Sequence, residues 1–435
     1  MSFFSKTHEQ RVGMLQRIQF GGDQMNDTIL QARAERYLAA LCSVKPNRRT
    51  GSAGNRAATE FFAATVGKLG YEIDTTPFPA LDHVKRGVEL ARDGDSYEVF
   101  ISPYSPGCDV EAELVVARSA DELRAAECAG AVLLLAGEVA SEPLMPRNFV
   151  FYNPDHHKAL YALLEEKRPA AIVSATPPSP EAAGALNPCP MFVDGDFHIP
   201  SVYCTEEVAA RLAAAAGERV RLRIDASLTE TTANNVVVRR NTDAARKIVF
   251  TAHIDAYEDS PGASDNAAGT VVLMLLAELL AARETSVGLE LVALNGEDHY
   301  SAGGQMDYLE RYGDELDRVV IVVNTDDVGF RGARSAFSFY ECPDDVRSVA
   351  ETLFRGYPGL VAGDPWYMGD HMIFVQQGLP AIAFSTERME ELMSTVAHTA
   401  ADVPEIVDCA RLVELARALD AFVGELDEAP VARTG

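Results

Sequence analysis

The sequence predicts an α/β protein with a doubly wound, mostly parallel mixed sheet, helices on both faces of the sheet, and an inserted β-rich domain. From Asn235 onward, short apolar runs typical of strands alternate with helical runs, which is the pattern of a parallel sheet. Residues 80–228 differ, with short strands and many prolines, including "TPPSP". We therefore expect one α/β domain formed by residues 1–79 and 229–435, and an insert of residues 80–228.

The elements before and within the insert follow from local patterns. A helical run covers residues 55–69, Gly70 suits the position after a helix end, and a strand begins near Tyr71. Inside the insert, residues 113–117 and 131–135 are apolar and typical of strands, and residues 161–166 are typical of a helix.

The second half carries the core of the predicted sheet. Helices fall between its strands, and a long helix covers about residues 404–426. The helix that begins near Val271 is apolar on nearly every face, so we expect it to be buried against the sheet. The predicted strands are residues 236–238, 248–250, 289–294, 319–323 and 381–384.

Bulk composition excludes several classes of protein. A chain of 435 residues with 47% hydrophobic content suggests two or three globular domains. Its net charge of −27 and pI near 4.7 argue against a nucleic-acid partner. The N-terminus has no apolar signal core, and the most apolar helix, residues 267–282, is too short to span a membrane. We therefore expect no membrane partner, and seven scattered cysteines without a CxxC motif predict a reduced, cytoplasmic protein.

Polar residues with metal-binding chemistry follow the core strands. In parallel sheets the carboxyl ends of the strands meet at one edge, where ligands bind. A single Asp there is usually a helix cap, but Asp, Glu and His gathered at one edge suit a zinc or other divalent site. The sequence contains no GxSxG, HExxH, P-loop or GxGxxG motif that would favour another chemistry. The residues at this edge are His253, Asp255 and Asp265, then Glu297 and Asp298, then Asp326 and Asp327, and finally His398 and Asp402.

The order and spacing of these motifs resemble the zinc aminopeptidase family, which includes bacterial leucyl aminopeptidases, glutamate carboxypeptidase II and glutaminyl cyclases. The resemblance rests on HxD, "GASDNAAG", "NGED", "TDDVG" and "AHTAAD", and it extends from Asn235 to Asp402. "RRTGSAGNRAATEFF" is similar to the opening helix of the family, and "GDHMIFVQQGLPAIAF" is similar to its SDH-containing helix. The insert resembles a protease-associated domain.

The resemblance implies roles for individual residues and two divalent metal ions, with zinc expected. Asp265 would bridge the ions, His253 and Asp326 would complete one site, and His398 and Asp298 the other. Glu297 would be the catalytic general base, and Asp255 would accept the second N–H of His253. Many family members have Glu where this chain has Asp298. The resemblance also implies a cis bond between Asp265 and Asn266 and support from Asp370 and His371. Tyr367 would either contact the oxyanion or line the pocket, since its spacing from Asp370 departs from the family pattern.

Other polar residues are expected to play no direct part. Glu258 and Asp259 are interpreted as loop surface, and Asp327 is expected to point away from Asp326. His156 and His157 are interpreted as loop residues of the insert, and His299 as a residue that is structural or supports a metal ligand.

The leading functional hypothesis is an exopeptidase that removes the N-terminal residue of peptide substrates. The alternatives are a carboxypeptidase, a single-zinc acyl-transfer enzyme of the glutaminyl cyclase type, and a non-catalytic binding protein on the same fold.

Overall fold

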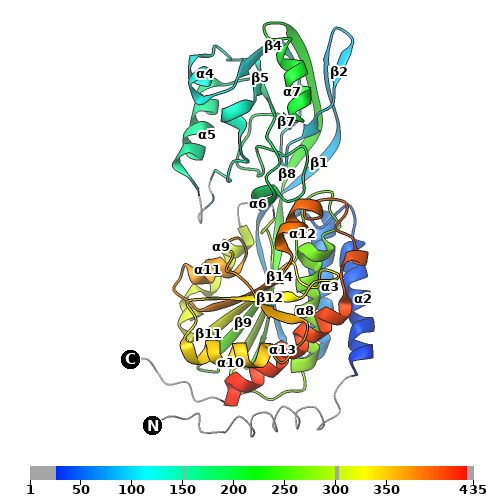
Figure 1. The fold of residues 1–435 in the computed structure, drawn as a ribbon, viewed down its shortest axis with the longest axis vertical. Helices are drawn as coiled ribbons and strands as arrows, with labels where there is room; N and C mark the ends of the chain where they lie inside the picture. Colours follow the sequence, from blue (N-terminus) through cyan, green and yellow to red (C-terminus); the bar gives the residue numbers. More distant parts are fainter. Residues whose placement is uncertain (1–25, 148, 150–152, 299–302, 429–435) are drawn as a thin grey trace.

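The computed structural model describes residues 26–147, 149, 153–298 and 303–428. The molecule is elongated and has two parts, with the strands β1 (Glu72–Arg92) and β8 (Arg219–Arg240) running between them (Figure 1). The expectations for the N-terminal segment and for His299 concern residues outside the described ranges.

The lower part in Figure 1 contains the predicted sheet, which is mixed and mostly parallel. Strand β9 pairs in parallel with β10 and β11, β11 with β14, and β12 with β13. Strand β8 adds antiparallel to β10, and β12 adds antiparallel to β14. The sheet runs in the order β13 (Leu360–Ala362), β12 (Ser335–Tyr340), β14 (Ala381–Thr386), β11 (Val319–Thr325), β9 (Lys247–His253), β10 (Gly288–Leu294) and β8.

Helices cover both faces of this sheet, as predicted. Side chains of a strand point alternately to its two faces, so Val236 and Val238 of β8 lie in one core and Val237 lies in the other. The first core also contains residues of α2 (Asp27–Cys42), α3 (Ala53–Val66), α8 (Gly269–Leu280), α10 (Asp344–Phe354) and α13 (Cys409–Glu428), and the second contains residues of α9 (Gly303–Tyr312) and α11 (His371–Val375).

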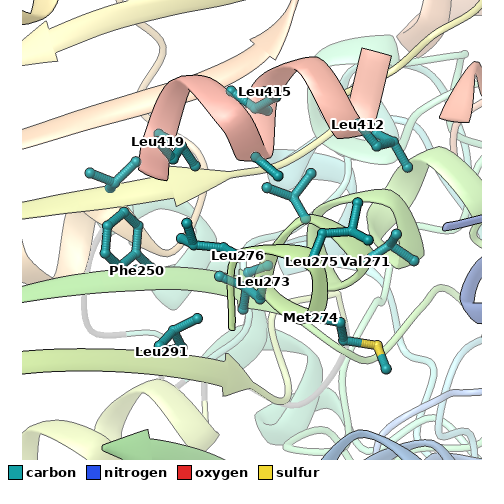
Figure 2. Packing of buried hydrophobic residues seen from close by; sticks show 14 of the residues in the cluster. Phe250, Val271, Leu273, Met274, Leu275, Leu276, Leu291, Leu412, Leu415 and Leu419 are labelled. Atoms are coloured by element: carbon teal, nitrogen blue, oxygen red, sulfur yellow. The ribbon is translucent and has the colours of Figure 1, made fainter. Parts of the chain in front are cut away.

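Helix α8 is the central element of the larger core. Figure 2 shows it between α13 on one side and strand residues such as Phe250 and Leu291 on the other. This position explains why the helix is apolar on nearly every face. By length and composition alone, Ala263–Leu280 could cross a membrane, but 94% of this segment is buried inside the protein.

The insert extends the sheet beyond β8 and has apolar clusters of its own. Strands β4 to β7 pair in parallel and β4 pairs antiparallel to β8. The predicted domain boundaries fall within β1 and β8, where Asp82 pairs with Thr229, and the division into domains stays a prediction. The elements are β2 (Asp95–Tyr97), β3 (Phe100–Ile101), β4 (Cys108–Ala117), α4 (Ala120–Ala125), β5 (Val132–Leu135), α5 (Asp155–Lys167), β6 (Ala171–Ser174), α6 (Pro180–Ala183), β7 (Ser201–Tyr203) and α7 (Glu206–Ala213).

Leu276→Ala should lower the free energy of unfolding by about 2–5 kcal/mol, because it removes a fully buried side chain and leaves a cavity beside α13. Urea unfolding followed by circular dichroism measures the change. Ile29→Ala is the control, since its side chain is 49% exposed and its loss should cost far less. Equal costs for the two variants would contradict this account of the core.

Candidate metal centre

The register of the parallel strands brings the predicted ligands together. Leu294 of β10 lies level with His253 at the end of β9, so Asp298 follows just beyond the same edge. Asn324 of β11 lies level with Thr251 of β9, which places Asp326 beside His253. Asp265 comes from the turn before α8, and His398 comes from the loop after α12 (Met389–Thr395).

Asp265 lies between two groups of side chains. Its Oδ1 is 3.2 Å from Nε2 of His253, and its Oδ2 is 3.2 Å from Nε2 of His398. The same atom of His253 is 3.2 Å from Asp326, and that of His398 is 3.3 Å from Asp298. Each oxygen of Asp265 therefore belongs to a separate set of ligand atoms, and the two sets share only this residue.

The residues fit a divalent metal such as zinc. In a tetrahedral site with bonds of about 2.0–2.1 Å, neighbouring ligand atoms are about 3.3 Å apart, as these nitrogen and oxygen atoms are. Oδ2 of Asp298 is also buried and accepts no hydrogen bond from the part of the chain that the structure describes. A buried carboxylate oxygen without a donor needs a cation.

The electrostatics of the centre point the same way. Burial, followed by the charge of Asp265, raises the pKa of Asp298 to about 6. Burial disfavours the imidazolium forms of His253 and His398, but the facing carboxylates outweigh it and raise the pKa of both rings well above the usual value. Protons thus collect where positive charge is needed, and a metal ion bound at these atoms would displace them.

Asp255 connects the two strand ends that flank the centre. Its carboxylate accepts hydrogen bonds from the backbone N–H groups of Gly296 (2.9 Å), Glu297 (3.3 Å) and Asp298 (3.1 Å). Thr50 donates to the same carboxylate at 3.1 Å. The predicted contact with Nδ1 of His253 spans 3.6 Å, longer than a hydrogen bond. Asp255 therefore chiefly holds the loop that presents Glu297 and Asp298.

Asp402 holds the turn that presents Asp265. Its two carboxylate oxygens accept from the backbone N–H groups of Ser264 (2.7 Å) and Asp265 (3.1 Å), so it supports a ligand instead of acting as one. Gly262 opens this turn with φ 62°, and a Cβ there would lie 2.5 Å from the backbone oxygen of Asp265. The bond between Asp265 and Asn266 is cis, which confirms that prediction.

The loop after Asp255 corrects one interpretation from the sequence. Glu258 is not loop surface, because its carboxylate is buried within 3.4–3.8 Å of Arg49, His83 and Lys85. Burial opposes its ionisation, but these partners outweigh burial and lower the pKa of Glu258 to about 2. Asp259 is exposed, as expected. No local pattern in the sequence marks Glu258, since its partners lie far upstream.

Tyr367, Asp370 and His371, which the resemblance suggested as supporting residues, differ in burial and in their contacts. Tyr367 is 69% exposed and its ring packs edge-on against Tyr340. Asp370 is buried and accepts from Gln305, and burial raises the pKa of its carboxyl group to about 7. Burial lowers the pKa of His371 to about 4, and its Nε2 lies 3.1 Å from the Trp366 carbonyl oxygen, so this neutral ring donates there and holds the segment before α11. An oxyanion contact from Tyr367 stays a prediction.

A second group of possible ligands lies in the insert. His156 and His157 are in the first turn of α5, not in a loop, and both face Glu142. Nδ1 of His157 accepts from the backbone N–H of Met145 at 3.1 Å, so its Nε2 carries the proton. A protonated Nε2 cannot bind a metal, and this group is better explained by the hydrogen bond of His156 to Glu142 at 3.0 Å and the charge contact of His157 with the same carboxylate.

Asp327 accepts a hydrogen bond from Ser264 at 3.4 Å and belongs to neither set of metal ligands among the described residues. Its φ of 54° turns the chain sharply after Asp326. Burial, followed by Asp265 and Asp326, raises the pKa of its carboxyl group well above the usual value.

A doubly wound sheet with two sets of nitrogen and oxygen ligands at its carboxyl edge defines a metal-dependent hydrolase class. Residues 235–423 match the model of peptidase family M28, so this segment is a domain of that family. This confirms the recognition made from the sequence for the segment that carries the ligands, and the insert lies outside it. No curated protein matches the chain.

Solved structures share the fold. The aminopeptidase from Aneurinibacillus sp. strain AM-1 is 20% identical, with 91% of this chain and 93% of that chain covered and a TM-score of 0.68. BSAP, a zinc aminopeptidase from Bacillus subtilis, is 19% identical, with 93% and 96% covered and a TM-score of 0.69. The glutaminyl cyclase of Porphyromonas gingivalis is 13% identical, with 93% and 100% covered and a TM-score of 0.50. The family match supports a peptidase, and the solved structures show that the whole chain shares their fold.

Glu258→Gln should destabilise the protein at pH 7 by up to about 3 kcal/mol, since a fall in pKa from 4.5 to about 2 is worth roughly 1.4 kcal/mol per unit. The folded-state pKa is depressed, so this stability is present above about pH 4.5 and is lost as pH falls towards 2. Urea unfolding at several pH values measures the difference. Asp259→Asn is the matched control, because its exposed carboxylate also contacts Lys85. The free energies of unfolding of Glu258→Gln and the unsubstituted protein should become more similar at low pH. A difference that stayed constant as the pH fell would contradict the assignment.

Proposed function

We propose that the chain is an aminopeptidase that binds two divalent metal ions, with zinc expected, and hydrolyses the N-terminal peptide bond of its substrates. The observation that carries the proposal is the position of Asp265, whose two oxygens each face the histidine of a separate ligand set. His253 and Asp326 would hold one ion with Asp265, and His398 and Asp298 would hold the other.

Glu297 is suited to proton transfer in this reaction. Two bound ions would polarise the scissile carbonyl and make water more acidic. A carboxylate oxygen of Glu297 lies within 4.8 Å of a ring nitrogen of His253 and of an oxygen of Asp298, so its carboxylate is close to both proposed metal sites. Burial and then nearby carboxylates such as Asp298 raise the pKa of Glu297, which favours a group that accepts a proton from water and returns it to the leaving amine.

The charge around the centre favours a substrate amino terminus over a carboxyl terminus. A carboxypeptidase needs a cation available to the carboxylate of its substrate. The two buried arginines beside the centre are already engaged, since Arg48 donates to the carbonyl oxygens of Ile254 and Gly262 and Arg49 donates to Asp82. Neither arginine is therefore available to a substrate carboxylate, which favours the aminopeptidase over the carboxypeptidase alternative.

The test is cleavage by the full chain loaded with zinc. Short peptides and aminoacyl-p-nitroanilides should lose their N-terminal residue, and N-acetylated copies of the same peptides should not. Release of the C-terminal residue would favour the carboxypeptidase alternative, and cyclisation of an N-terminal glutamine without hydrolysis would favour the glutaminyl cyclase alternative. No reaction with any of these substrates would contradict the proposal.

Location and insert belong to the same proposal. The seven cysteines are all free, which supports a reducing, cytoplasmic setting. We also keep the proposal that the insert is a protease-associated-like domain.

Glu297→Ala should reduce turnover by about 100- to 10,000-fold, because it removes the proton acceptor. The metal content should stay unchanged, since Glu297 is outside both ligand sets. Turnover of the N-terminal substrates and elemental analysis measure the two quantities. Glu297→Gln, which keeps the shape of the side chain, should behave alike. Near-normal turnover, or loss of metal in both variants, would refute the role.

Asp298 should make the His398 site the weaker of the two, because its side chain is one methylene shorter than the Glu that many family members have at this position. The ion at that site should leave first under chelation, while the ion held by His253 and Asp326 remains. Anomalous scattering from crystals during a zinc titration measures the order of filling. Asp298→Glu should reduce the difference in zinc affinity between the His253 site and the His398 site. Equal affinities, or earlier loss from the His253 site, would show the prediction to be wrong.

A further inference from the structure

The loop that carries His398 contacts the insert. Helix α6 of the insert packs against α12, the helix that precedes this loop (Figure 1). The backbone N–H of Ala185, just after α6, donates to the carbonyl oxygen of Ala397 at 3.0 Å. The residue that follows Ala397 is the metal ligand itself, so the insert holds the ligand through its neighbour in the chain.

Gly184 brings the insert into contact with the ring of His398. It has φ 61°, a conformation that other residues rarely adopt. A Cβ at this position would lie 2.7 Å from the carbonyl oxygen of Ala397 and 3.1 Å from Cγ of His398. The first distance is shorter than real Cβ contacts, so any side chain here must displace the His398 loop or the insert.

The rest of the surroundings hold His398 less firmly than the sheet holds His253. His398 has φ 65°, which is unfavourable for a non-glycine residue. On its own side, the loop is tied to α12 by the N–H of Ala397, which donates to Leu392 at 3.0 Å. The ring of Tyr257 stacks on the imidazole, with centroids 4.6 Å apart. His253, by contrast, is the last residue of a central strand paired on both sides.

We infer that Gly184 and Ala185 of the insert are positioning residues for His398, so that the insert completes one of the two metal sites and not the other. This inference rests on the proposed two-ion centre. The hydrogen bond from Ala185 to Ala397 and the close approach of Gly184 to the loop set the direction in which Nε2 of His398 points, towards Asp265 and Asp298. Within the described ranges, no hydrogen bond or ion pair joins the insert to His253 or Asp326.

Gly184→Ala tests the inference. The variant should lose about 10- to 100-fold in affinity for one of two zinc ions, the range typical when the outer support of a ligand is lost, while the other ion is retained at its original affinity. Titration of the metal-free full chain with zinc against a chromophoric chelator measures both constants. Anomalous scattering from a crystal of the partly loaded variant should then locate the retained ion at His253.

The matched control is Gly130→Ala. Gly130 is also in the insert and has φ 76°, but a Cβ there has no neighbour within 4 Å. It therefore also tests a side chain at a positive φ but without touching the His398 loop, and both zinc affinities should stay unchanged. Ala185→Pro is a second variant, which replaces the N–H donor with a ring carbon directed at the carbonyl oxygen of Ala397, and it should weaken the same site.

Several results would overturn the inference. These are two unchanged affinities in Gly184→Ala, equal weakening of both sites, or an equal effect in Gly130→Ala. If the variants did not fold, a crystal structure of the unsubstituted protein with zinc would decide. Separation of Gly184 and Ala185 from Ala397 in that structure would refute the contact. The outcome is independent of the proposed activity. If the unsubstituted protein cleaves peptides but Gly184→Ala has unchanged zinc affinities, only the inference fails. If Gly184→Ala loses one zinc ion selectively but no peptide is cleaved, only the proposed function fails.

Discussion

The crowding of carboxylates around Asp265 is the constraint on which the rest of the structure depends. Several acidic side chains are buried within a few ångströms of one another, which is costly unless each is compensated. The fold meets part of this cost with backbone dipoles: Asp255 receives the amides of residues 296–298, and Asp402 receives those of residues 264 and 265. Amides carry no net charge, so the positive charge required by Asp265, Asp298 and Asp326 is left for metal ions to supply.

The ligands could be predicted because they are tied to the regular part of the fold. Parallel strands end at one edge, so a residue just after β9, β10 or β11 must lie near the others once the register is set. The burial of α8 could be predicted for a similar reason, because a helix that is apolar on nearly every face must be covered on all sides. Strands β12 and β13 were not predicted, since "SAFSFY" mixes small polar and aromatic residues and β13 has only three residues.

The supporting contacts could not be predicted because they join distant segments through loops. Glu258 is buried by His83 and Lys85 of β1 and by Arg49 of the segment before α3, and only the fold brings these three residues to the loop. Gly184 lies in a proline-rich stretch of the sequence, and its contact with His398 depends on how the insert is oriented. Sequence periodicity reports which face of an element is buried. It carries no information about where one group of elements rests against another.

The paired strands β1 and β8 have a mechanical consequence. With β1 at 21 residues and a rise of about 3.3 Å per residue, the pair is a beam roughly 70 Å long that is shared by both parts of the molecule. Its ladder is irregular between Lys85 and Gly87, and such bulges locally raise the twist of a strand. The orientation of the insert relative to the sheet is therefore set where this irregularity lies. Because Ala185 of the insert is bonded to Ala397, a change in that orientation would also move the loop of residues 397 and 398.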